Sequence, residues 1–405
     1  MSNTQKKNVP ELRFPGFEGE WEEKQLGDLT DRVIRKNKNL ESKKPLTISG
    51  QLGLIDQTEY FSKSVSSKNL ENYTLIKNGE FAYNKSYSNG YPLGAIKRLT
   101  RYDSGVLSSL YICFSIKSEM SKDFMEAYFD STHWYREVSG IAVEGARNHG
   151  LLNVSVNDFF TILIKYPSLE EQQKIGKFFS KLDQQIELEE QKLELLQQQK
   201  KCYIQKIFSQ ELRFKDEEGN YYKGWNKKQL KDVLEFSNKR TINENEYPVL
   251  TSSRQGLILQ SDYYKDRKTF AESNIGYFIL PKNHITYRSR SDDGIFKFNL
   301  NLMIDVGIIS KYYPVFKGID ANQYYLTLHL NYQLKKEYIK YATGTSQLVL
   351  SQKDLQNIKT KLPSYEEQQK IGDFFSEIDR LVEKQSSKVG RLKVRKKELL
   401  QKMFV

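Results

Sequence analysis

The sequence predicts an α/β protein built by tandem duplication, in which two mixed α/β domains are joined by two long antiparallel coiled-coil helices with pseudo-two-fold symmetry. Three observations lead to this fold class: one segment of the chain occurs twice, short apolar runs alternate with turn residues within each copy, and a heptad pattern ends each copy. We expect domains at residues 1–165 and 211–361, and helices at 166–210 and 362–405.

The duplication is clearest at the end of each copy. Residues 166–183 read YPSLEEQQKIGKFFSKLD and residues 362–379 read LPSYEEQQKIGDFFSEID, with 13 of 18 positions identical at an offset of 196. The starts also agree, because ELRF occurs at 11–14 and again at 211–214. The middles match only at scattered points. Shared ends predict a common scaffold, and unlike middles predict two different targets. Neutral drift after a recent duplication is the alternative, but drift should not spare the ends so selectively.

Each copy is expected to contain both strands and helices. Apolar runs bounded by Gly, Asn and Pro predict strands within 110–116, 160–166 and 278–287. Apolar residues at helical spacing predict corresponding helices at 120–138 and 322–340.

The heptad seams run from residue 175 to 207 and from 371 to 403, in steps of four and three. A helix of about 40 residues is about 60 Å long, and an unpaired apolar stripe leaves it poorly stable in water. Each helix therefore needs a partner. The other copy is the obvious one, although both helices could instead bind other proteins or make the chain dimerise. The residues expected to pair the helices are Ile186, Glu189, Leu193, Leu196, Lys200, Gln385, Val389, Leu392, Lys396 and Leu399.

One antiparallel register matches polar with polar positions and apolar with apolar positions. Both seams are interrupted at equivalent places, and polar seam positions often specify alignment. This register sets the following pairs opposite one another: Glu189 with Lys396, Gln385 with Lys200, Ile186 with Leu399, Leu193 with Leu392, and Leu196 with Val389.

The composition favours a polyanionic partner. A formal charge of +12 and a pI near 9.2 suit nucleic acid, although a merely soluble basic surface is the alternative. Two cysteines far apart and four histidines without ligand spacing predict no metal site. The chain has no stretch approaching the roughly 20 apolar residues that span a bilayer, so we expect no membrane contact and a cytoplasmic location.

The opening ELRFPGFEGEWEEKQLGDL and the twice-used PSxEEQQKIGxFFSxxD resemble the specificity subunits of bacterial type I restriction-modification systems, over essentially the whole chain. The resemblance implies that each divergent region is a target recognition domain that reads one half of a split double-stranded DNA sequence. The paired helices would then set the gap and dock the modification subunits. It also implies two modification subunits and two restriction subunits as partners, with S-adenosylmethionine, ATP and magnesium bound by them and no cofactor in this chain.

Missing motifs agree with a non-catalytic chain. No two prolines are adjacent, so the Asn/Asp-Pro-Pro-aromatic motif of amino-methyltransferases is absent. The Gly176-Lys177 pair is followed by phenylalanine, so the chain has no phosphate-binding GxxxxGK[ST] loop.

Base-reading residues should lie in polar loops of the divergent regions, because lysines and arginines on phosphates supply affinity without sequence information. Three loops in each copy meet this criterion. The resemblance further favours two of the loop pairs, the one with Gln51 and Arg254-Gln255 and the one with Arg147-Asn148 and Thr345 to Gln347. For each single residue a solvated loop is the competing interpretation. The candidates are Gln51, Asn84, Lys85, Ser86, Tyr87, Ser88, Asn89, Arg147 and Asn148 in the first copy, and Arg254, Gln255, Arg288, Ser289, Arg290, Ser291, Thr345, Ser346 and Gln347 in the second.

Two other functions compete with DNA reading. A duplicated coiled-coil scaffold that binds acidic proteins would show no sequence preference on DNA. A nuclease or methyltransferase with a diverged active site is disfavoured, since the two copies share no paired acids in these loops.

Overall fold

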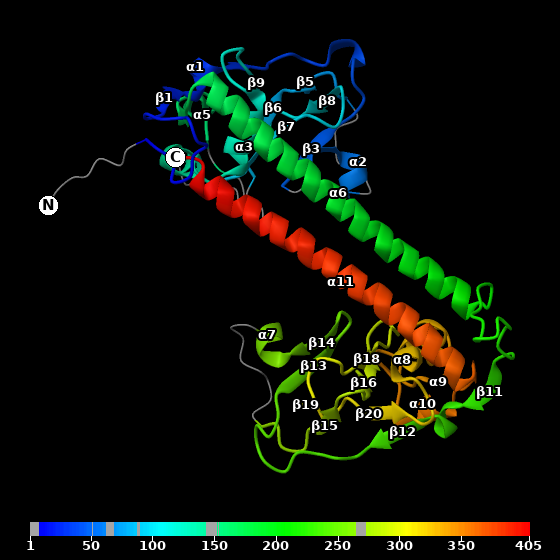
Figure 1. Ribbon diagram of the computed structural model, residues 1–405. Helices are drawn as coiled ribbons and strands as arrows, with labels where there is room; N and C mark the ends of the chain where they lie inside the picture. Colours follow the sequence, from blue (N-terminus) through cyan, green and yellow to red (C-terminus); the bar gives the residue numbers. More distant parts are fainter. Residues whose placement is uncertain are drawn as a thin grey trace. The chain divides into compact units, whose positions relative to one another are not determined.

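The computed structural model describes residues 8–50, 52–61, 69–86, 90–142, 152, 154–264 and 273–405. The chain divides into two compact units. Unit 1 comprises Met1–Gln191 and Ser387–Val405, and unit 2 comprises Lys192–Ser386. Each unit therefore contains a segment of both long helices, α6 (Leu169–Phe208) and α11 (Tyr365–Lys402), which Figure 1 draws as unbroken ribbons.

Unit 1 is built on an antiparallel four-stranded sheet in the order β2-β9-β6-β7, with three two-stranded sheets, β1-β10, β3-β4 and β5-β8. The strands are β1 (Glu22–Gln25), β2 (Thr30–Arg32), β3 (Leu46–Ser49), β4 (Gly53–Asp56), β5 (Thr74–Lys77), β6 (Phe81–Asn84), β7 (Ala95–Arg98), β8 (Ser104–Leu107), β9 (Tyr111–Ile116) and β10 (Leu163–Tyr166). The helices before α6 are α1 (Leu26–Leu29), η1 (Lys38–Leu40), α2 (Gln57–Phe61), α3 (Lys122–Asp130), α4 (Tyr135–Ile141) and α5 (Val156–Phe160).

Unit 2 repeats this plan. Its sheet β12-β20-β16-β18 matches the main sheet of unit 1. The sheet β14-β13-β19-β15 joins two antiparallel pairs, β13-β14 and β15-β19, through one parallel pair, β13 with β19. The remaining pairs are β11-β22 and β17-β21. The strands are β11 (Asn226–Gln229), β12 (Leu234–Ser237), β13 (Val249–Ser253), β14 (Gly256–Leu259), β15 (Phe278–Pro281), β16 (Ile285–Tyr287), β17 (Arg290–Ser291), β18 (Phe298–Leu300), β19 (Val306–Ile309), β20 (Val315–Gly318), β21 (Leu348–Val349) and β22 (Lys359–Leu362). The helices are η2 (Leu230–Asp232), α7 (Gln260–Tyr264), α8 (Gln323–Tyr332), α9 (Tyr338–Tyr341) and α10 (Gln352–Asn357).

The duplication and the α/β class are confirmed, whereas several predicted elements are divided. The predicted strand 278–287 holds β15 and β16, because Asn283 has a φ of +60° in the turn between them. The predicted helix 120–138 holds α3 and α4, since Ser131 ends the first helix by donating its hydroxyl hydrogen to the carbonyl oxygen of Tyr128 at 2.6 Å. The predicted helix 322–340 is divided in the same way into α8 and α9.

The repeated EEQQKIG string makes the same contact in each unit, between a long helix and the start of a shorter helix. In unit 1 the Gln172 side chain accepts a hydrogen bond from the backbone N–H of Ser121 at 3.0 Å. In unit 2 Gln368 does the same for Asn322 at 3.2 Å. Ser121 and Asn322 are the N-caps of α3 and α8, so the glutamines fix the start of each of these helices against a long helix.

The glycine of this string allows the close approach of two helices. A Cβ at Gly176 would lie 2.6 Å from the backbone nitrogen of Phe124, closer than two such atoms can pack. At the equivalent Gly372 a Cβ would lie 2.7 Å from the side-chain oxygen of Asn322. In both units, the glycine of the EEQQKIG string therefore lets a long helix lie close to the start of a shorter helix.

A phenylalanine at the end of α6 or just after the end of α11 is part of the core of each unit. Phe404 is buried in unit 1, with its ring 5.5 Å from that of Phe124 and 5.8 Å from that of Phe179, centroid to centroid. Phe208 is buried in unit 2, 6.0 Å from Tyr325 and 6.1 Å from Trp225. Each unit's core thus includes residues of both α6 and α11.

Within each unit, α6 and α11 run antiparallel, as predicted. In unit 1 Asp183 pairs with Lys396 at 2.7 Å, while Glu189, further along α6, pairs with Lys388, which comes earlier in α11. In unit 2 Lys200 pairs with Asp379, the counterpart of the Asp183–Lys396 pair at the offset of 196.

The predicted register is wrong. Glu189 is paired with Lys388 rather than Lys396, and Lys200 with Asp379 rather than Gln385. Lys200 and Lys396 pair with Asp379 and Asp183, which are not seam positions of the heptads. Lys396 also contacts Asp130 on α3 at 2.7 Å.

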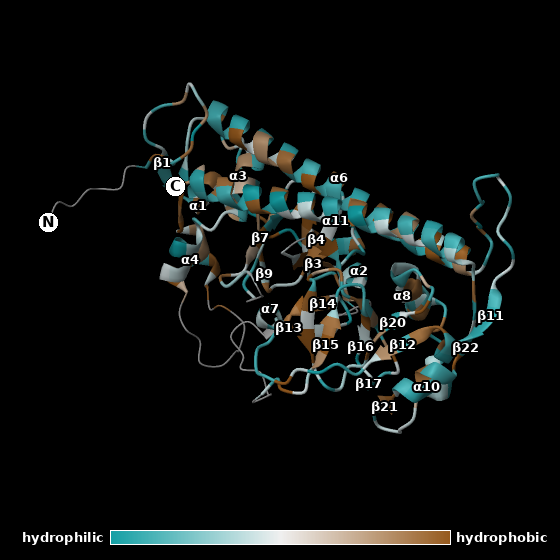
Figure 2. Cartoon of the chain, turned by 60° about the horizontal axis from the view of Figure 1, so that its bottom comes forward, coloured by the Kyte–Doolittle hydropathy of each residue, from teal (hydrophilic) through white to brown (hydrophobic). Residues whose placement is uncertain are grey.

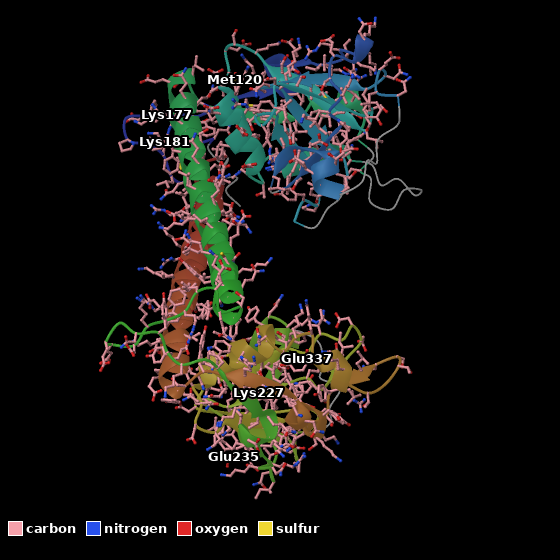
Figure 3. The ribbon with its side chains drawn as sticks, turned by 90° about the vertical axis from the view of Figure 1, so that its right-hand side faces the viewer. Met120, Lys177, Lys181, Lys227, Glu235 and Glu337 are labelled. Carbon is pink, nitrogen blue, oxygen red and sulfur yellow. The ribbon has the colours of Figure 1, made fainter. Side chains whose placement is uncertain are left out.

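Burial of the predicted pairing residues is uneven. Ile186, Gln385 and Val389 are buried, and Leu392 and Leu399 pack against the core of unit 1. Leu193 and Leu196 are partly exposed. The outward faces of the long helices are polar, as Figure 2 shows in teal, and Lys177 and Lys181 project from α6 in Figure 3.

Candidate functional site

Several of the predicted loop residues of unit 2 meet around one cavity of about 380 Å³. The loops come from the β13–β14 hairpin and from the chain that follows β16. Of the predicted residues, Arg254, Gln255, Arg288, Arg290 and Ser291 line the cavity. Two loops that the sequence put forward separately therefore lie around the same cavity.

The β13–β14 hairpin presents Arg254 and Gln255 at its tip. Ser253 pairs with Gly256 across the hairpin, so the two residues between them form a tight two-residue turn. The Ser253 hydroxyl accepts a hydrogen bond from the backbone N–H of Gln255 at 3.1 Å and donates one to the carbonyl of Gly256 at 2.9 Å. The side chains of the turn are consequently exposed.

A short strand pair brings the third predicted loop to the same place. In β17–β21, Arg290 pairs with Val349 and Ser291 pairs with Leu348. Beside this pair, the side-chain nitrogen of Gln347 donates a hydrogen bond to Asp292 at 2.8 Å. Gln347 thus contacts Asp292, which lines the cavity, although Gln347 itself does not line it. Thr345 and Ser346 are exposed and do not line the cavity either.

Two adjacent aspartates connect the loops. Asp293 accepts from the Arg254 guanidinium at 2.7 Å, from the Ser291 hydroxyl at 2.9 Å and from the backbone N–H of Ile295 at 3.2 Å. The hydrogen bond from Ser291, then those from Ile295 and Arg254, lower the pKa of Asp293. The carboxylate is therefore ionised at neutral pH.

A second cavity, of about 280 Å³, lies on the other side of Arg290. The Arg290 guanidinium lies over the ring of Tyr312, 5.6 Å from its centroid. Ser289, also a predicted residue, lines this second cavity and donates a hydrogen bond to the carbonyl of Tyr312 at 2.9 Å. Arg290 lines both cavities, whereas no ion pair joins Arg288 to another described residue.

The corresponding region of unit 1 is described only in part. Gln51, Tyr87, Ser88, Asn89, Arg147 and Asn148 lie outside the described residues. Of the others, the side-chain oxygen of Asn84 accepts from the backbone N–H of Ser86 at 3.0 Å, and Lys85 donates to the carbonyl of Val154 at 3.3 Å. Asn84 and Lys85 therefore also stabilise their own loop.

Sequence reasoning missed the supporting residues of the unit 2 site. Asp293, Lys297 and Tyr312 were not predicted, although all three line a cavity or hold a predicted residue. Burial, together with the nearby charge of Lys200, lowers the pKa of Lys297. The Asp-Asp-Gly that follows Arg290-Ser291 is a turn signal in the sequence, and it is the one local pattern that points to Asp293.

The described residues contain neither a group of metal ligands nor a membrane-spanning helix. Among those residues, no three His, Cys, Asp or Glu side chains are grouped so as to hold a metal ion. No described helix combines the length and the apolar character needed to cross a bilayer. Cationic, amide and hydroxyl donors around an open cavity suit recognition of an anionic ligand.

Comparisons with known proteins agree in their result. Residues 18–198 and 222–390 match the family model of the type I restriction modification DNA specificity domain. The type I restriction enzyme MjaVIII specificity subunit of Methanocaldococcus jannaschii is 24% identical over 97% of this chain and 93% of its own length.

Solved structures of low sequence identity share the fold. An S subunit of a type I restriction-modification system from M. genitalium superposes with a TM-score of 0.60 at 16% identity, covering 98% of this chain and 99% of that one. A chain from a structure describing complex assembly and conformational transition of the type I R-M system gives a TM-score of 0.50 at 19% identity, covering 98% and 99%.

Proposed function

The chain belongs to the type I restriction modification DNA specificity family, whose members supply sequence recognition rather than catalysis, and from this we propose that its two units each read one half of a bipartite duplex DNA target. The family assignment leaves the scaffold alternative, with acidic protein partners and no sequence preference, without support. A specificity subunit needs no cofactor of its own and works in a complex with DNA and partner subunits.

One observation carries the proposal: the two units share their framework contacts and differ in their loops. The Gln172–Ser121 and Gln368–Asn322 contacts are equivalent. In contrast, the sequence between β3 and β4 is Gly50-Gln51-Leu52, whereas that between β13 and β14 is Arg254-Gln255. A conserved frame with unlike reading loops is what two different half-sites require.

The reading residues we assign are the predicted loop residues, with the arginines and amides as the main candidates for base edges. Arg presents two donors to the edge of guanine, and Gln or Asn matches adenine. We assign residues 1–165 and 211–361 as the two target recognition domains, and residues 166–210 and 362–405 as the spacer that sets the gap and docks the modification subunits.

The partners we propose are two modification subunits and two restriction subunits, acting in the cytoplasm. S-adenosylmethionine, ATP and magnesium would be bound by these partners and not by this chain. The basic balance of the chain, +12, favours association with DNA phosphates.

The test is selection from a random duplex pool by the chain assembled with its modification subunit, at near-physiological salt. We expect a split motif with a fixed gap. Exchange of residues 211–361 for the corresponding segment of a relative should then change one half of the motif only, with exchange of residues 18–165 as the matched control for the other half. A change in both halves after one exchange, or retention without any preference, would contradict the proposal.

A further inference from the structure

Asp292 and Asp293 are unexpected residues at a surface that, under the proposed function, binds a polyanion. A carboxylate beside DNA phosphates is repelled, so two adjacent ones need a compensating role. Asp292 lines the cavity, and Asp293 accepts hydrogen bonds from Arg254 and Ser291, which also line it. Their partners are the side chains of Arg254 and Gln347, which the proposed function assigns to DNA contact.

We propose that Asp293 positions Arg254, and Asp292 positions Gln347, for base reading in the half-site of unit 2. The inference rests on the proposed function and assigns specificity within it. Asp293 is itself fixed, because one oxygen accepts from Ser291 at 2.9 Å and from Ile295 at 3.2 Å, while the other accepts from Arg254 at 2.7 Å. A carboxylate held in this way can hold the arginine in turn.

The Arg254 contact leaves the guanidinium free to bind. The contact with Asp293 uses one nitrogen, Nη2, of a group with five N–H donors. The Arg254 side chain is 64% exposed and that of Asp293 44%, so a base edge can reach the arginine while the ion pair persists. An arginine ordered before binding loses less conformational entropy on contact with guanine.

Asp292 acts on Gln347 by the same principle. The Gln347 amide donates from its nitrogen to Asp292 at 2.8 Å, which fixes which end of the amide faces outward. The remaining N–H and the carbonyl oxygen can pair with the N7 and N6 groups of adenine. Two aspartates on one loop thus orient readers from two other loops, the β13–β14 turn and the segment before β21.

The experiment compares Asp293→Asn, Arg254→Gln and the double variant, each assembled with the modification subunit. Binding to the selected duplex and to its single-base variants gives the preference at every position, and a salt titration gives the slope of log K. Asp305→Asn is the matched control, because Asp305 forms an exposed ion pair with Lys282 at 3.3 Å in the same unit.

We expect Arg254→Gln to reduce the preference for guanine at one position by roughly fivefold or more, the discrimination of one bidentate contact. Asp293→Asn should reduce the preference at the same position, with an unchanged salt slope, and should add nothing in the Arg254→Gln background. Asp292→Asn should act at a different position. The control should leave all preferences unchanged.

Three results would overturn the inference. Weaker binding to all sequences with a salt slope reduced by about 0.9 in Arg254→Gln would make Arg254 a phosphate contact. Independent, additive effects of the two substitutions would exclude a positioning role. An unchanged preference in Asp293→Asn would do the same. In each case the wild-type chain still selects a split motif, whereas failure of the proposed function would remove that motif in the wild type.

Discussion

The substitution Phe404→Ala tests whether the segment that follows α11 contributes to the core of unit 1. The side chain is 3% exposed and its ring packs against Trp21, Phe124, Tyr128 and Phe179. Burial of a phenylalanine contributes about 1.5 to 3 kcal/mol, and removing it leaves a cavity, so Phe→Ala substitutions in cores cost about 3 to 5 kcal/mol. We therefore expect Phe404→Ala to cost about 3 kcal/mol of stability, at the lower end of this range.

The tryptophans allow unit 1 to be followed separately. Trp21 and Trp134 belong to unit 1 and Trp225 to unit 2, and the chain has no other tryptophan. In a Trp225→Phe background, urea unfolding followed by fluorescence therefore reports on unit 1 alone. The control is Val394→Ala on the same helix, a 58% exposed position where we expect a change within about 0.5 kcal/mol.

Refutation would take one of two forms. A loss below about 1 kcal/mol for Phe404→Ala would mean that the helix end is not part of the core. A loss no larger than that of the control would mean the same. Phe208→Ala, at the equivalent position of unit 2, should leave the unit 1 transition in the Trp225→Phe background unchanged.

Three further predictions concern stability. Gly176→Ala should cost about 1 to 3 kcal/mol, since the new Cβ would lie 2.6 Å from the Phe124 nitrogen, whereas Gly390→Ala, with nothing within 4 Å, should stabilise slightly, as urea midpoints would show. Burial lowers the pKa of His329 to about 3, so unit 2 should lose stability as the pH falls from about 6.5 towards 3, and His329→Gln should reduce that loss in urea midpoints taken between pH 7 and pH 4. Burial alone would raise the pKa of Asp130, but two contacting lysines outweigh it and lower the pKa to about 2; unit 1 should therefore lose stability as the pH falls from about 4 towards 2, and a loss that persists unchanged in Asp130→Asn would contradict this assignment.

The sequence alone determined the duplication, the α/β class and the two long heptad helices, whereas it left open whether these helices pair with one another. These follow from local and repeated patterns: apolar periodicity decides element type, and the 196-residue offset relates the copies. Element ends were less predictable. The division of 278–287 into two strands depends on a positive φ at Asn283, which the apolar pattern does not reveal.

Only the tertiary structure decided the helix register and the supports of the candidate site. The heptads fix which face of a helix is apolar, but Lys200 and Lys396 take their alignment from Asp379, Asp183 and Asp130, one of which lies on a different element. In the same way, the sequence marked Arg254 and Gln347 as polar loop residues, whereas their orientation depends on carboxylates 39 and 55 residues away along the chain. Long-range hydrogen bonds and ion pairs join groups through space, so no local pattern of residues records them.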